Sequence, residues 1–240
     1  MALSRLTTAA VVFAALSLGS SCAELPKDQK GTVDHIQLSG IVRVGLIENP
    51  PWVIRTAGEP AGAEVDLMRE FAAEQDARPE WYWGGEEKLL GALEKFELDA
   101  VAGGLSDQTP WSARVGLTRY YFEEKFDVGT RPGDTAFNGL KGRQIAVTDT
   151  RLAGILREKG ADPVPVAVAE EHGKRPLAAA DWELARLGLT PANQNLLKDR
   201  HVVAVPPGEN QLVKRLEEFL SRRHDRIPSM LGRQPEVSRR

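Results

Sequence analysis

The sequence is poor in the residues that build metal and redox sites. A single cysteine, Cys22, occurs among 240 residues, so no internal disulfide can form. The four histidines are scattered without an H-E-x-x-H pair, and one cysteine cannot complete a zinc site. We therefore expect no metal site.

Signatures of nucleotide cofactors and of nucleophilic enzymes are also missing. Neither G-x-x-x-x-G-K-[ST] nor G-x-G-x-x-G occurs, so no recognisable phosphate-binding loop is encoded. The stretch "GGLSDQ" has Gln108 where a G-x-S-x-G nucleophile elbow requires glycine. Two adjacent carboxylate pairs, Glu86-Glu87 and Glu123-Glu124, are expected to be solvated. We therefore expect no cofactor.

The charge balance argues against a nucleic-acid partner. Lys and Arg number 31 against 34 Asp and Glu, which gives a net charge of −3. This charge provides no field that would hold nucleic acid, and no basic run is interleaved with aromatic residues. The chain is 42% hydrophobic, and its 240 residues suffice for one large core or two small ones.

Residues 1–22 differ in kind from the rest and predict export. Arg5 precedes an uncharged apolar stretch, residues 6–18, that is too short to span a bilayer core of roughly 30 Å comfortably. The segment ends in "LGSSC", which resembles the lipobox of bacterial lipoproteins and implies that Cys22 is lipidated and anchors the chain to a membrane. Ordinary cleavage after Ala23 is the alternative and would discard Cys22. In both cases the mature chain is expected outside the cytoplasm, in the periplasm or held there by lipid.

The pattern after residue 38 predicts two α/β lobes. Residues 23–38 are polar with little periodicity and are expected to form a tether. Strands and helices then alternate, an order that favours parallel strands with helices packed on the sheet. The same alternation restarts after about residue 128, and the tail at 225–240 is expected to be loose. The expected strands lie at 40–47, 79–83, 98–104, 144–148, 162–169 and 201–209, and the expected helices begin near 64, 86, 151 and 210, whereas 177–189 is ambiguous.

The stretch "GGLSDQTPW" at 103–111 is a candidate binding turn. In open α/β sheets, ligands bind at the carboxyl ends of the strands, and this turn follows such an end. Gly103 and Gly104 leave the backbone bare, and Ser106 offers a hydroxyl. Thr109-Pro110 is typical of a helix start, whose free N–H groups favour a carboxylate or another anion. A plain glycine turn capped by Thr109 is the alternative.

Several stretches in a fixed order resemble solute-binding protein family 3. They are "GIVRVGLIENPPWV", "AGAEVDLMREFAAEQ", "WYWGGEEKLLGALEKFELDAVAGGLS", "TPWSARVGLTRYYFEE" and "LKGRQIAVTDT". This family comprises bacterial extracytoplasmic receptors that hand amino acids and similar polar solutes to ABC importers. The resemblance implies a type II periplasmic binding protein: each lobe is a mostly parallel sheet flanked by helices, and two hinge strands join the lobes. Lobe 1 is expected at 39–127 plus 204–224, and lobe 2 at 128–203.

The resemblance also implies how such a receptor works. A monomer binds one small polar solute in the cleft, its lobes close, and a membrane permease recognises the closed form. Trp52 takes the position that stacks on the solute, and Gly104 and Ser106 take positions that bind its polar end. Thr150 matches the hydroxyl that closes over the solute, and Asp181 matches the acid that holds an amino group. The full implied set adds Glu48, Leu105, Thr148 and Asp149, while Asp66 matches an acidic residue that fixes the start of the first helix.

The sequence departs from the family where a carboxylate would be gripped. Trp111 stands in place of the arginine that clamps the α-carboxylate of an amino acid, and an indole does not replace a guanidinium fork. Arg114 lies three residues further on and belongs either to the pocket or to the surface. The resemblance therefore leaves open whether the solute is a standard amino acid. Lobe 2 also looks short, because "AEEHGKRPLAAA" replaces a longer helix and strand.

Two other functions remain as alternatives to the transport receptor. Cyclohexadienyl dehydratases are enzymes on the same fold, and Glu48, Asp149 or Asp181 could supply their acid. A solute sensor would instead present its closed form to a separate signalling protein. We expect a receptor without enzymatic activity.

Overall fold

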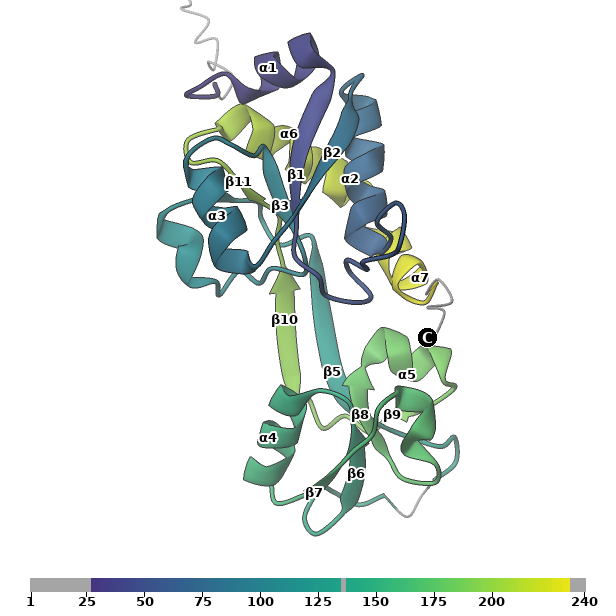
Figure 1. Ribbon diagram of the computed structural model, residues 1–240. Helices are drawn as coiled ribbons and strands as arrows, with labels where there is room; N and C mark the ends of the chain where they lie inside the picture. The colour runs from purple at the N-terminus through teal and green to yellow at the C-terminus, as the bar shows by residue number, and fades with distance from the viewer. Residues whose placement is uncertain (1–26, 135–136, 234–240) are drawn as a thin grey trace, which may run out of the picture.

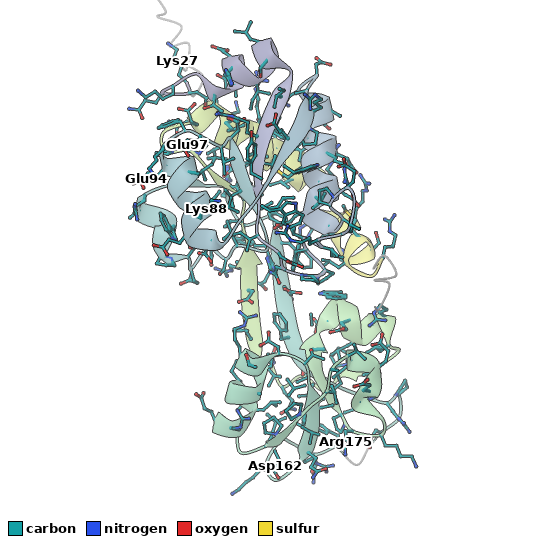
Figure 2. The ribbon with its side chains drawn as sticks, in the orientation of Figure 1. Lys27, Lys88, Glu94, Glu97, Asp162 and Arg175 are labelled. Atoms are coloured by element: carbon teal, nitrogen blue, oxygen red, sulfur yellow. The ribbon has the colours of Figure 1, made fainter. Side chains whose placement is uncertain are left out.

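Two α/β lobes joined by two long strands make up the computed structural model, which describes residues 27–134 and 137–233 (Figure 1). The connecting strands are β5 (Phe122–Thr130) and β10 (Leu197–His201), which pair antiparallel. Lys27 lies at the far end of lobe 1 and Asp162 at the far end of lobe 2 (Figure 2). The predicted signal peptide and Cys22 fall outside the described residues.

Lobe 1 is a mixed five-stranded sheet in the order β2-β1-β3-β11-β4. The two β1 pairings, with β2 and β3, are parallel, whereas β11 runs antiparallel to β3 and β4. Chain segments before and after lobe 2 therefore build this one sheet. Its strands are β1 (Ile41–Leu46), β2 (Arg78–Trp83), β3 (Ala100–Ala102), β4 (Gly116–Leu117) and β11 (Ala204–Val205), and its main helices are α2 (Ala63–Glu74), α3 (Glu86–Glu94) and α6 (Asn210–Ser221).

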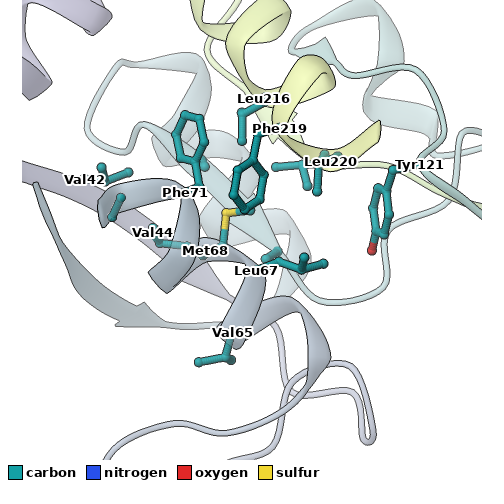
Figure 3. Close-up of a cluster of buried hydrophobic side chains, with 14 of the residues drawn as sticks. Val42, Val44, Val65, Leu67, Met68, Phe71, Tyr121, Leu216, Phe219 and Leu220 are labelled. Atoms are coloured by element: carbon teal, nitrogen blue, oxygen red, sulfur yellow. The ribbon is translucent and has the colours of Figure 1, made fainter. Parts of the chain in front are cut away.

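The core of lobe 1 lies between the sheet and helices α2 and α6 (Figure 3). Apolar side chains recur along α2 at helical spacing, and this stripe faces α6. The rings of Phe71 and Phe219 meet edge to face with centroids 5.5 Å apart. Burial of these rings links the C-terminal helix to the first half of the lobe.

The structure differs from the sequence-based expectation at both ends of the fold. Residues predicted as tether form helix α1 (Thr32–Ser39), which buries Val33 and Ile36 in lobe 1. The predicted loose tail from residue 225 contributes to η3 (His224–Arg226) and forms α7 (Ile227–Leu231), which buries Ile227, Met230 and Leu231. In both segments a few apolar residues at helical spacing decide the structure, although most of their neighbours are polar.

Lobe 2 contains a six-stranded sheet in the order β10-β5-β8-β6-β7, to which β9 adds on β5. Strand β6 pairs parallel with β7 and β8, whereas β5 is antiparallel to β8. The stretch at 177–189, ambiguous in sequence, divides into a strand and a short helix. The elements of this lobe are β6 (Gln144–Val147), α4 (Thr150–Glu158), β7 (Asp162–Pro165), η2 (Ala169–His172), β8 (Leu177–Ala180), α5 (Asp181–Arg186) and β9 (Thr190–Pro191).

The predicted fold class, two α/β sheets with flanking helices, is confirmed. One predicted helix is shorter than expected: Thr109-Pro110 opens only a 3-10 turn, η1 (Pro110–Ala113), capped by the Thr109 hydroxyl. Within the two described ranges, none of the helices has the length and apolar character needed to cross a membrane.

Candidate functional site

A cavity of about 620 Å³ lies between the two lobes. Lobe 1 lines it with the loop at 49–52 and the turn at 104–106, and lobe 2 with segments at 148–152, 167–170 and 179–186. Both connecting strands add side chains: Glu124 and Phe126 from β5, Asp199 and His201 from β10. A larger groove of about 940 Å³ runs beside α6, but lobe 2 supplies none of its lining residues. The first cavity is therefore the candidate site.

The glycine turn at the lobe 1 side depends on the absence of side chains. Gly104 has φ 70°, and a Cβ there would lie 2.3 Å from the Asn49 Nδ2 atom. That Asn49 amide donates a hydrogen bond of 3.0 Å to the Gly103 carbonyl. The predicted bare turn is thus present, and only glycine fits this position without displacing Asn49.

The free N–H groups of this turn are used by the buried carboxylate of Glu64. The Gly104 N–H donates to Glu64 Oε2 at 2.9 Å, and the Gly103 N–H donates to the same oxygen. The Tyr121 hydroxyl donates to the other oxygen, Oε1. Burial raises the pKa of Glu64, and these three hydrogen bonds oppose the rise. Glu64 thus ties the turn to the first turn of α2 and to the residue preceding β5.

The sequence resemblance pointed to a different acidic residue at the start of this helix than the one the structure buries. The resemblance pointed to Asp66, but Asp66 is exposed and forms an ion pair with Arg69 at 2.9 Å. Glu64 shares a helix face with Leu67, Met68 and Phe71, at spacings of three, four and seven residues, and that face is buried. This spacing could have predicted from the sequence that the Glu64 carboxylate is buried.

A chain of side-chain contacts crosses the connecting strands. The Trp52 ring stacks on His201 with centroids 4.0 Å apart, and only 3% of Trp52 is exposed. His201 Nε2 lies 2.9 Å from Glu124 Oε2, and Trp182 Nε1 donates to Glu124 Oε1 at 2.7 Å. Trp182 packs against the cores of both lobes. One hinge-strand carboxylate therefore links the lobe 1 loop to helix α5 of lobe 2.

Glu124 corrects an expectation from the sequence. The pair Glu123-Glu124 was expected to be solvated, yet Glu124 is buried. In a strand, alternate residues share a face, so Glu124 points with Phe126 toward the cavity, while Glu123 forms ion pairs with Lys198 and Arg200. The alternation of side chains along this strand could have predicted that Glu124 is buried and Glu123 is not.

The charged side chains at the lobe 2 side of the cavity form ion pairs with one another. Asp149 caps α4, accepting from the Arg151 N–H at 2.6 Å and the Leu152 N–H at 3.4 Å. The Arg151 guanidinium lies between Asp199, at 2.9 Å, and Asp149, at 3.3 Å. The Arg186 guanidinium is likewise held by two carboxylates. The rim of the cavity on this side is therefore a set of ion pairs.

The second pair of carboxylates surrounds Arg186. Its Nη1 lies 2.8 Å from Glu170 and its Nη2 lies 3.5 Å from Glu183. Burial is the main cause of a raised pKa at Glu183, and the charge of Arg186 opposes it. These residues carry no sequence motif, and only the fold brings Glu170 and Arg186 together.

The predicted site residues divide into two groups in the structure. Five of them line the cavity: Trp52, Gly104, Ser106, Thr148 and Asp149. Ser106 lies beside His201 through an isolated backbone bridge, and its hydroxyl accepts from the Gln108 N–H at 3.2 Å.

The other predicted residues do not belong to the lining of the cavity. Glu48 is paired with Arg55 at 3.3 Å. Leu105 is buried in lobe 1, and Thr150 is the first residue of α4. Asp181 begins α5, where burial and then the charge of Asp127 raise its pKa.

Trp111 and Arg114 lie together on lobe 1, away from the cavity. The Arg114 guanidinium lies 4.3 Å from the centre of the Trp111 ring and 2.5 Å from a carboxylate oxygen of Glu94. Glu94 projects from the outer side of α3 (Figure 2). The structure thus places the displaced arginine on the surface.

We expect Arg114→Ala to leave solute affinity unchanged. Its partners, Glu94 and Trp111, lie outside the cavity, and its ion pair is solvent-exposed. Isothermal titration of the parent and the variant with the same solute measures the difference. A large loss of affinity in Arg114→Ala would mean that this arginine contributes to solute binding.

Comparison with known proteins identifies the type of fold. Residues 42–226 match the family model described as bacterial extracellular solute-binding proteins, family 3. Membrane-bound lytic murein transglycosylase F of Vibrio campbellii is 30% identical over 127 residues, which cover 50% of this chain and 23% of that protein. The chain thus spans less than a third of the length of the curated relatives it matches.

Two solved structures share the fold over most of the chain. An ancestral cationic amino acid solute-binding protein has a TM-score of 0.70 at 14% identity and covers 84% of this chain and 100% of its own. A Bacillus subtilis structure has a TM-score of 0.69 at 17% identity and covers 86% and 95%. At such identities the likeness establishes the fold alone.

Proposed function

Because this chain belongs to the bacterial extracellular solute-binding proteins, family 3, we propose that it is an extracytoplasmic receptor that binds one small polar solute between its lobes. One observation carries the proposal: the 620 Å³ cavity is lined by both lobes and by both connecting strands. A solute there contacts both halves of the protein at once. Such a position couples binding to the relative movement of the lobes.

Binding drives closure by bending at the connecting strands. The antiparallel ladder of β5 and β10 joins the lobes, and these strands also carry Glu124 and His201 to the cavity. A solute that contacts the lobe 1 loop and the start of α4 together makes more contacts in the closed form. That difference in affinity shifts the equilibrium toward closure.

The receptor hands its solute to a partner without chemical change. We assign it to an ABC importer, whose membrane permease recognises the closed form, with Cys22 as the lipid anchor. A dehydratase activity is not favoured by the arrangement of its candidate acids. Glu48 and Asp181 lie outside the lining of the cavity, and Asp149 is engaged as a helix cap.

A thermal-shift screen of the mature protein against amino acids, amines, organic acids and sugars tests the proposal. A solute at a hundredfold its Kd is expected to stabilise the fold by about 2.7 kcal/mol. The matched control is Ala167→Trp, which fills the cavity at an exposed position. The variant should fold and lose the response. Absence of any stabilising solute, or an undiminished response in Ala167→Trp, would refute the proposal.

A further inference from the structure

At two segments that border the cavity, the glycine turn and the start of α4, backbone N–H groups that could bind an anion are already occupied by carboxylates of this chain, whereas the start of α5 has no side-chain cap. The Gly103 and Gly104 N–H groups donate to Glu64. In the first turn of α4, the Arg151 and Leu152 N–H groups donate to Asp149. A helix start and a glycine turn are the places where a solute carboxylate would be held, and here each holds a side chain instead.

The guanidinium groups of the cavity are engaged in the same way. Arg151 lies between Asp149 and Asp199, and Arg186 lies between Glu170 and Glu183. Neither presents a vacant fork to a solute carboxylate. Arg114, the remaining candidate for that role, is bound to Glu94 on the outer surface.

Negative charge exceeds positive charge around the cavity. Five carboxylates line it against two guanidinium groups: Glu124, Asp149, Glu170, Glu183 and Asp199 against Arg151 and Arg186. Three aromatic side chains line the same space: Trp52, Phe126 and Trp182. Carboxylates beside aromatic faces form surroundings that favour a cation, by charge and by cation–π attraction.

An unpaired acceptor at the same cavity supports this view independently. His201 lines the cavity and is only 3% exposed, and its Nδ1 atom finds no hydrogen-bond partner among the residues that the structure describes. In the tautomer that donates from Nε2 to the Glu124 carboxylate, 2.9 Å away, the ring proton lies on Nε2. In the neutral ring Nδ1 is then an acceptor, which suits an N–H group of a solute and not a carboxylate.

From these observations we propose that the solute is an organic cation that carries an amine or guanidinium group and no carboxylate. The inference rests on the proposed receptor function and names the class of its solute. Glu183 and Asp199, whose carboxylates keep acceptor sites beyond their ion pairs with Arg186 and Arg151, bind the cation, and the aromatic side chains cover its hydrocarbon part. A standard amino acid would bring a carboxylate to a cavity where the N–H groups of the glycine turn and of Arg151 and Leu152, and both guanidinium groups, already hold carboxylates.

Two pairs of probes test the inference, because the members of each pair differ by a single carboxylate. They are agmatine with L-arginine, and cadaverine with L-lysine. Isothermal titration is expected to show each amine binding about tenfold or more tightly than the matching amino acid. Tighter binding of L-arginine or L-lysine, or a preference for an organic acid, would overturn the inference while leaving the receptor function intact. Absence of binding by every solute would remove the receptor function as well.

A pair of variants locates the effect in the cavity. Glu183→Gln removes a carboxylate that lines the cavity, and Glu94→Gln removes one on the outer surface; each carboxylate is paired with an arginine. We expect Glu183→Gln to weaken agmatine binding about tenfold and Glu94→Gln to leave it unchanged. Equal affinities for agmatine in Glu183→Gln and the parent would contradict the assignment of the cation to this cavity.

Discussion

Replacement of Glu64 by alanine is expected to lower the free energy of unfolding by about 3–5 kcal/mol. The substitution leaves the Gly103 and Gly104 N–H groups and the Tyr121 hydroxyl without their acceptor in the interior of lobe 1. Each buried donor without a partner costs about 1–3 kcal/mol. Urea unfolding followed by circular dichroism measures the change.

The isosteric variant Glu64→Gln separates the hydrogen bonds from the charge. Burial raises the pKa of Glu64 in the folded protein above its ordinary value of 4.5, which the unfolded chain keeps. The stabilising contribution of this group is therefore fully present below pH 4.5 and is lost as the pH rises through the folded pKa. Glutamine does not titrate, so the stability of the parent relative to Glu64→Gln should fall as the pH rises above 4.5.

Two results would contradict this role of Glu64. A change below about 1 kcal/mol in Glu64→Ala would mean that the three donors find other partners or water. A parent that gains stability relative to Glu64→Gln with rising pH would mean that the folded protein favours the ionised carboxylate.

Replacement of Trp52 by alanine is the second large expected loss, about 3–5 kcal/mol of unfolding free energy. The ring is 3% exposed, stacks on His201 and would lie 3.3 Å from a Cβ at position 104. Its removal leaves a void beside both connecting strands. Thermal and urea unfolding of the variant measure the loss, and the same samples report solute affinity.

Trp52→Phe is the matched control for this position. A phenyl ring keeps a stacking face for His201, so we expect a stable fold and a moderate loss of affinity. The sequence predicted that Trp52 stacks on the solute, whereas the structure stacks one of its faces on His201. If Trp52→Ala kept nearly parental stability but bound no solute, the main role of the ring would be to contact the solute and not to stabilise the fold.

The family and the fold class could be predicted because they depend on the order of elements along the chain. The resemblance to family 3 is confirmed by the match over residues 42–226. Alternation of strands and helices predicted two α/β lobes, and the face shared by Glu64 and Phe71 could have identified the buried carboxylate. Short helices such as α1 and α7 escaped prediction because only two or three buried side chains define each.

The contents of the cavity could not be predicted in the same way. Trp52 meets His201, and Arg186 meets Glu170, only after the chain has folded, and no local spacing records such pairs. The bare turn at 103–104 was predicted from its two glycines, but the buried carboxylate that accepts from its N–H groups lies about 40 residues away on α2. The helix start predicted at Thr109-Pro110 as an anion site is only the 3-10 turn η1, and the N–H groups of Gly103 and Gly104 donate to a side chain of the protein itself.

Small-angle X-ray scattering with and without a saturating solute measures closure of the two lobes, with Ala167→Trp as the matched control. We expect a smaller radius of gyration for the parent with solute and no change for the variant. A solute that binds tightly while the radius of gyration stays constant, or that compacts parent and variant alike, would contradict binding between two closing lobes.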